Sequence, residues 1–233
     1  MSYSITIGFS LMGGILPALL WLWFWLKEDR LHPEPKSRIA LLFLMGMVSV
    51  FLVLPIEKLI YSFFSGNSPT NIALLTVVLW AATEEVFKFL AAYFGALKTK
   101  IVDEPIDAVI YMITTALGFS ALENALFLSN LLDTGLISQT IITGNSRFLG
   151  ATLLHTACSA AVGVLIGLAY YKKPLAKRIF LFTGLAFGII LHSVFNLLII
   201  KLENETFFVF AGVWVLIISL IVLIEKVKVV RFS

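Results

Sequence analysis

The sequence predicts an all-α, polytopic membrane helix bundle with about seven transmembrane helices. Three observations carry this prediction: the composition, the division of the chain into long apolar runs, and the placement of the basic residues. Of the 233 residues, 60% are apolar and 13% are charged, whereas soluble chains hold about 45–50% apolar and about 25% charged residues. An ordinary soluble domain is therefore excluded, and the single residue Cys158 excludes an internal disulfide.

The apolar runs are each near the ~20 residues that cross ~30 Å of hydrocarbon. The first run lacks the basic start of a signal peptide, so we expect it to be a retained span. Pro105 follows two acidic residues and marks the start of the fourth span, because proline and acidic side chains suit the first turn of a helix. The expected spans, in one domain (residues 1–233) without a linker, are Ile5–Leu26, Ile39–Tyr61, Asn71–Leu97, Ile106–Leu132, Arg147–Tyr171, Ile179–Ile200 and Phe207–Lys226.

Basic residues predict the orientation of the spans. Positive charge is retained in the cytoplasm, so the N-terminus is expected outside and the C-terminus inside. The opposite side keeps Arg147 and Lys201 at loop edges and Lys58 near a span end. Of the 17 basic residues, 13 fall on the expected cytoplasmic side: Lys27, Arg30, Lys36, Arg38, Lys98, Lys100, Lys172, Lys173, Lys177, Arg178, Lys226, Lys228 and Arg231.

The third span carries charges that a lipid-facing helix would not tolerate. Glu84, Glu85 and Lys88 lie near its middle, and each charge costs about 2.5–3.5 kcal/mol at a helix centre. The flanking residues are apolar on every side, so a soluble surface helix is excluded as well. We therefore expect these three side chains to face the interior of the bundle and to find partners on other helices.

The other spans supply those partners. Glu123 and Asn124 lie in the fourth span, His155 in the fifth, and His192 and Asn196 in the sixth, where a spacing of four puts both on one helix face. Counted from the expected outer span ends, Glu123, His155 and His192 lie roughly 12–14 Å below the outer surface, and Glu84 and Glu85 roughly 20 Å below it. A layer of ionisable groups within a membrane indicates a functional site facing a wet cavity.

Such a cluster fits two chemistries, and the spacing leaves both open. In one, His155, His192 and Glu123 bind a divalent metal, with zinc the expected ion, and leave a position for water. In the other, a glutamate and a histidine activate water directly and a polar group steadies the oxyanion. The zinc signature of two histidines four residues apart with a glutamate between them is absent from the sequence.

Four segments, in this order, resemble the PrsW family of intramembrane proteases, which lies within the wider group of CAAX prenyl protease-like proteins. The acidic, proline-containing loop at His32–Pro35 is also similar to that family, and the resemblance covers a core of residues 27–200. The four segments are Glu84-Glu85-x-x-Lys88, Asp107 with Gly118-Phe119 and Glu123-Asn124, Arg147 with His155, and His192-x-x-x-Asn196.

The resemblance implies a multi-pass cell-membrane hydrolase of the metallo- or glutamate type, performing regulated intramembrane proteolysis. Its implied substrate is a membrane-anchored protein cut near the outer leaflet, as in cleavage of an anti-sigma factor. Nucleic acid is not expected as a partner. Lys88 and Asn124 become supporting residues. The implied catalytic residues are Glu84, Glu85, Glu123, His155, His192 and Asn196.

Two other function classes use the same residues. A proton- or ion-coupled transporter could relay protons through the buried glutamates and histidines, although no inverted repeat of the kind many carriers show is evident. A non-catalytic membrane scaffold would use the cluster only for stability or partner binding.

Overall fold

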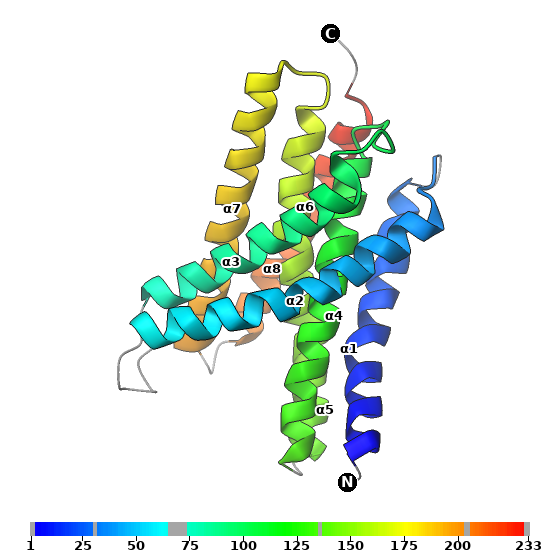
Figure 1. Ribbon diagram of the computed structural model, residues 1–233. Helices are drawn as coiled ribbons and strands as arrows, with labels where there is room; N and C mark the ends of the chain where they lie inside the picture. The colour runs from blue at the N-terminus through cyan, green and yellow to red at the C-terminus, as the bar shows by residue number, and fades with distance from the viewer. Residues whose placement is uncertain (1–2, 30–31, 65–73, 135–136, 203–205, 231–233) are drawn as a thin grey trace.

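The computed structural model describes residues 3–29, 32–64, 74–134, 137–202 and 206–230, and over these ranges it is helical without strands. The expected all-α membrane bundle is confirmed (Figure 1). A 3₁₀-helix covers Leu26–Asp29, and π-helical turns cover Tyr93–Leu97 and Arg147–Ala151. The α-helices are α1 (Tyr3–Trp25), α2 (Lys36–Phe64), α3 (Leu74–Ala92), α4 (Asp107–Asp133), α5 (Ile137–Ser146), α6 (Thr152–Leu168), α7 (Pro174–Lys201) and α8 (Thr206–Lys228).

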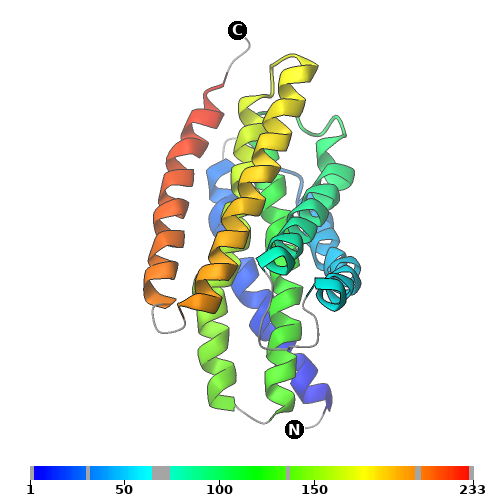
Figure 2. The same cartoon turned by 90° about the vertical axis from the view of Figure 1, so that its left-hand side faces the viewer.

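Helix α4 is the centre of the bundle. It packs against α1, α2, α3 and α6, and its apolar window is 89% buried. The outer helices α1, α2, α7 and α8 are only 28–39% buried over their windows and turn large apolar side chains outward, as a lipid-facing surface requires. Figure 2 shows α8 on one side of the bundle and the α2–α3 pair on the other.

The α2–α3 pair crosses the bundle obliquely, which brings the middle of α3 over α6 and α7 (Figure 1). Two glycines let α2 approach α4 closely. A Cβ atom on Gly118 would meet the backbone of Phe43, and one on Gly46 would meet the backbone around Thr115. Small residues at such crossings let helix backbones pack in a membrane, so this contact positions α3 and the side chains it carries.

We expect Gly118→Ala to destabilise the protein even though alanine favours helix over glycine. The added methyl group meets backbone that cannot rotate away, and overpacking of this kind costs about 1–3 kcal/mol. Thermal unfolding in detergent measures the effect. Gly212→Ala is the matched control, because nothing lies within 4 Å of a Cβ at this helical position; equal stability of the two variants would contradict the packing role.

Two expected span boundaries were wrong or incomplete. Within the described residues, six helices are long and apolar enough to cross a membrane; α3, which corresponds to the third expected span, is not among them, and it carries three charges. The start expected for that span, Asn71, lies outside the described residues. The fifth expected span starts too late, because the helical run begins at Ile137 and continues through Arg147. The guanidinium of Arg147 pairs with Glu123 and Asn124 of α4. Its charge is therefore satisfied inside the bundle, and the helical run continues past it. His155 therefore lies further from the start of its helical run, Ile137, than from the expected span start at Arg147.

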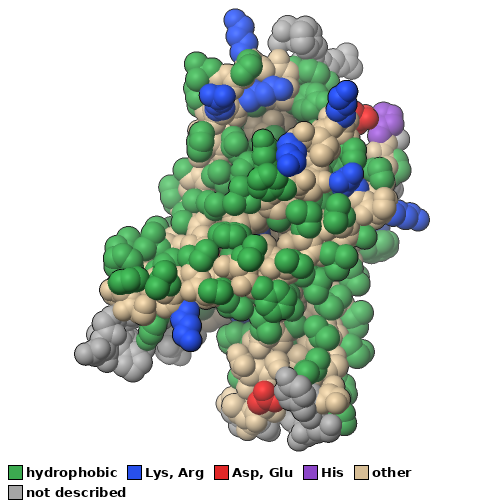
Figure 3. All heavy atoms as spheres, viewed as in Figure 1, with side chains coloured by type: hydrophobic (Ala, Val, Ile, Leu, Met, Phe, Trp, Pro, Cys, Tyr) green, Lys and Arg blue, Asp and Glu red, His purple; other side chains and the backbone are tan. Residues whose placement is uncertain are grey.

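Basic side chains gather at the end of the bundle where the chain terminates (Figure 3). Below them a broad apolar surface covers the helices in the same view. The start of α1 and the end of α8 lie at opposite ends of the bundle (Figure 1). The positive-inside rule assigns the basic end to the cytoplasm.

Candidate active site

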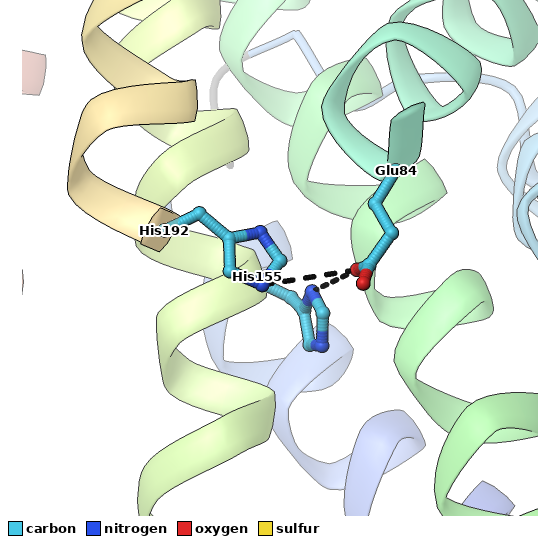
Figure 4. A group of neighbouring side chains, drawn as sticks. All are labelled: Glu84, His155 and His192. Atoms are coloured by element: carbon cyan, nitrogen blue, oxygen red, sulfur yellow. Dashed lines mark ion pairs between the residues drawn. The ribbon is translucent and has the colours of Figure 1, made fainter. Parts of the chain in front are cut away.

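Three helices bring together one carboxylate and two imidazoles. Glu84 from α3, His155 from α6 and His192 from α7 point toward one another in the interior of the bundle (Figure 4). Oε2 of Glu84 lies 3.6 Å from Nδ1 of His155 and 3.8 Å from Nε2 of His192. The residues are 8%, 3% and 2% exposed, so any charge here is largely removed from solvent.

Oε2 of Glu84 is the unsatisfied atom of this group. Among the described residues it is buried without a hydrogen-bond partner, and such an atom costs about 1–3 kcal/mol unless something binds it. Its two separations are too long for direct hydrogen bonds and suit an intervening water or ion. The geometry therefore points to a third atom held between the carboxylate and the imidazoles.

The same three side chains fit a divalent metal. One ligand atom from each lies within 4.8 Å of the others. A tetrahedral zinc ion with ligands at about 2.0–2.2 Å would separate its ligand atoms by about 3.3–3.6 Å, close to the distances around Glu84. Together with the unsatisfied oxygen, this donor set of one carboxylate and two imidazoles is of the kind that catalytic zinc uses.

Glu85 holds the site together from behind. Its Oε1 accepts from Nζ of Lys88 at 2.5 Å and lies 2.8 Å from Nδ1 of His192, and its Oε2 faces the hydroxyl of Ser159 at 3.5 Å. Glu85 and Lys88 are fully buried. Because a carboxylate only accepts, Nδ1 of His192 carries the proton and the Nε2 lone pair is left facing Glu84. A carboxylate behind a histidine in this way fixes its tautomer and ring orientation.

Glu123 fixes the second histidine. Nε2 of His155 lies 2.9 Å from Oε2 of Glu123, which also pairs with the Arg147 guanidinium at 3.0 Å. Nδ1 of His155, the nitrogen that lies 3.6 Å from Oε2 of Glu84, also accepts a hydrogen bond from Nζ of Lys88 at 3.1 Å, because a lysine ammonium only donates. Arg147 in turn donates to Oδ1 of Asn124 at 2.5 Å. Supporting residues therefore orient both imidazoles toward Glu84.

A cavity of about 260 Å³ opens onto this group. Glu84, Glu123 and both histidines lie on its wall, and Asn196 is a further polar lining residue. Glu85 and Lys88 are not part of the lining; they lie behind the imidazoles. The structure places Glu123 beside His155. Two buried groups that share His192 have metal-ligand spacing, Glu84 with both histidines and Glu85 with Cys158 and His192, and neither contains Glu123.

Sequence reasoning missed Glu57. This residue of α2 places its carboxyl close to the Glu84 carboxyl. A charged residue two positions after Pro55 in an apolar run is a usable signal. Arg147 was expected at a loop edge, at the start of the fifth span, whereas its side chain pairs with Glu123 and Asn124 inside the bundle.

Comparison with known proteins gives a consistent family relationship. The family described as PrsW family intramembrane metalloprotease matches residues 34–224 of the chain. Relatives named Protease PrsW include one from Geobacillus kaustophilus, 27% identical over 200 residues, which are 84% of this chain and 82% of the relative. One from Halalkalibacterium halodurans is 26% identical over 226 residues, 94% of this chain and 96% of the relative.

The relative from Bacillus subtilis with the same name is 24% identical over 199 residues, covering 84% of each chain. No solved structure matches the chain significantly.

Proposed function

Because the chain belongs to the PrsW family of intramembrane metalloproteases, we propose that it is an endopeptidase that hydrolyses a peptide bond of a membrane-anchored protein. One observation carries the proposal: an unsatisfied carboxylate oxygen of Glu84 lies beside Nδ1 of His155 and Nε2 of His192, two oriented histidines inside a membrane bundle. Peptide hydrolysis within a membrane needs a water molecule that is bound and activated. The space between Glu84 and the two histidines suits such a water.

The residues around the cavity divide the work of hydrolysis. Glu84 takes a proton from the water as the water oxygen attacks the scissile carbonyl carbon. Glu84 later returns that proton to the leaving amine. Nε2 of His192 accepts a hydrogen bond from the same water and aligns it. The amide of Asn196 donates toward the oxyanion of the tetrahedral intermediate, which preorganised donors stabilise.

Glu84, His155 and His192 are also the residues that would hold a zinc ion. When bound, such an ion polarises the scissile carbonyl and lowers the pKa of its water toward 7. Glu84 is then a ligand, and Glu123, which lines the same cavity, is the carboxylate left to take the proton. Both routes use the same histidines in the same orientation.

The substrate we propose is a single-span protein cut in the outer half of the membrane, with an anti-sigma factor as the candidate class. Glu123 lies sixteen residues from Asp107 along α4, or about 24 Å at 1.5 Å per residue. Since Asp107 is at the basic, cytoplasmic end, this depth is beyond the middle of a ~30 Å hydrocarbon core. The resemblance to the family also supports cleavage on the outer side of the membrane.

Reconstituted proteolysis tests the proposal. The purified chain in liposomes should cleave a single-span reporter, and His155→Ala and His192→Ala should each lower the rate to near background, because each removes an oriented nitrogen from the water site. His32→Ala is the matched control. His32 is the one histidine of the chain outside the site, and its side chain is 71% exposed at the basic end of the bundle. Full activity in the two site variants would overturn the proposal.

Metal content separates the two routes. Elemental analysis of wild type and His192→Ala, paired with a chelator titration of proteolysis, gives the answer directly. About one zinc per chain, absent from the variant and required for activity, supports the metal route. Activity that survives complete chelation excludes it and leaves Glu84 as the direct base.

A further inference from the structure

Three carboxylates converge at the basic end of the bundle. Asp29 ends the 3₁₀-helix after α1, Glu34 lies in the following loop, and Asp107 begins α4. One oxygen from each lies within 4.8 Å of the others. Along α4 this cluster, which we call the loop acid cluster (Asp29, Glu34 and Asp107), is about 24 Å from Glu123. It is therefore separate from the candidate active site.

Each member of the loop acid cluster is held in place by a donor. Oδ2 of Asp107 accepts two backbone N–H groups of the loop just before α4, each at 2.8 Å. The hydroxyl of Tyr111 donates to Oε2 of Glu34, and the backbone N–H of Glu34 donates to Asp29. These donors hold the three carboxyls where one oxygen of each lies within 4.8 Å of the others.

Among the described residues, no ion pair gives these carboxyls a counter-charge, and Arg30, the residue after Asp29, lies outside those residues. Asp29 is only 5% exposed, and its Oδ2 is buried without a hydrogen-bond partner among the described residues. The carboxyls of Glu34 and Asp107 are within hydrogen-bonding reach of each other, which requires a proton or a cation between two like charges. A single shared proton would serve that pair and still leave Oδ2 of Asp29 unsatisfied.

Three basic side chains at this end of the bundle have other partners. Arg38 donates to the carbonyl of Gly95 at 2.6 Å, and Lys228 pairs with Glu28 and with a second glutamate of α8. His32 pairs with Glu104. Over the described ranges, no ion pair reaches the loop acid cluster.

We propose that Asp29, Glu34 and Asp107 bind one hard divalent cation of the Mg²⁺ or Ca²⁺ type. An all-oxygen donor set suits these ions, whereas zinc prefers nitrogen and sulfur. Asp29 also lines a cavity of about 1130 Å³ whose walls include charged side chains of the same end, which gives a hydrated ion a route in. The bound cation ties the loop after α1 to the first turn of α4.

Binding of Mn²⁺, followed by electron paramagnetic resonance on the purified full chain loaded with zinc, tests the proposal. We expect one Mn²⁺ per chain, displaced by Mg²⁺ or Ca²⁺, and the ion that displaces it at the lower concentration is the preferred occupant. Asp29→Asn should weaken Mn²⁺ binding at least about tenfold. The controls Glu225→Gln, an exposed acid at the same end, and His192→Ala should bind Mn²⁺ as wild type does.

Two results would overturn the proposal: no Mn²⁺ bound by the wild-type chain, or equal binding by Asp29→Asn and wild type. If Asp29→Asn does not fold, the wild type alone decides. Mg²⁺ or Ca²⁺ at millimolar concentration should then raise its unfolding temperature in detergent by several degrees, since a ligand of the folded state stabilises it, and an unchanged temperature refutes the site. Proteolysis is not the readout, so this result is independent of the proposed activity.

Discussion

Glu84→Gln is expected to lower the rate of proteolysis by about 10²–10⁴-fold, the contribution of a general base, while the fold is retained. Glutamine keeps the shape of the side chain but can neither take a proton from water nor serve as an anionic metal ligand. Stability should not fall, because the substitution removes a buried carboxylate whose Oε2 has no hydrogen-bond partner in the described structure. Initial rates on a single-span reporter, with thermal unfolding of the same samples, measure both effects.

Glu85→Gln provides the comparison for that experiment. Glu85 bonds Lys88 and His192, so its loss should lower stability and activity together, whereas Glu84→Gln should separate them. Activity close to wild type in Glu84→Gln would remove this residue from the mechanism. A strong loss of stability in Glu84→Gln would instead assign it a structural role.

Lys88→Met is expected to destabilise the protein by about 3–5 kcal/mol, the cost of leaving one member of a buried ion pair uncompensated. Lys88 and Glu85 are fully buried, and Nζ of Lys88 is 2.5 Å from Oε1 of Glu85. Methionine has a similar length and no charge, so the result reports the loss of charge more than a loss of volume. Denaturant titration in mixed micelles, or thermal unfolding, measures the change in the free energy of unfolding.

The double variant Lys88→Met/Glu85→Gln tests the cause. Removing both charges should recover much of the lost stability, because the penalty comes from the unpaired carboxylate and not from the missing ammonium. If the two substitutions simply add, Lys88 stabilises the bundle through other contacts, such as its approach to the ring of Phe119.

The membrane fold was predictable because its signals are local. Apolar runs predicted the helices, and three charges in α3 could only be interior. The histidines of α6 and α7 and the acid of α4 were correctly expected near Glu84, since intramembrane polar groups need partners on other helices. Their catalytic roles, and the single domain with its core at residues 27–200, stay predictions.

What sequence reasoning could not supply depends on packing between helices. The oblique crossing of α2 decides that Glu57 meets Glu84, and no spacing along α2 encodes that angle. The helix continues through Arg147 because Glu123 and Asn124 lie opposite it, which requires the register of α4 against the run of α5 and α6. The sequence also could not decide whether Glu84 or Glu85 faces both imidazoles. The two residues are adjacent on one helix, and only the rotation of that helix within the bundle determines which side chain points toward the histidines.

The contact between Glu85 and His192 spans 107 residues of chain, and this separation has a consequence for biogenesis. At about 5–20 residues per second of synthesis, α3 reaches the membrane several seconds before α7 exists. During that interval Glu85 cannot use its final partner, whereas Lys88 is present three residues away on the same helix. The Glu85–Lys88 pair is neutral overall, so it lowers the free-energy cost of inserting α3 into the membrane before α6 and α7 are made.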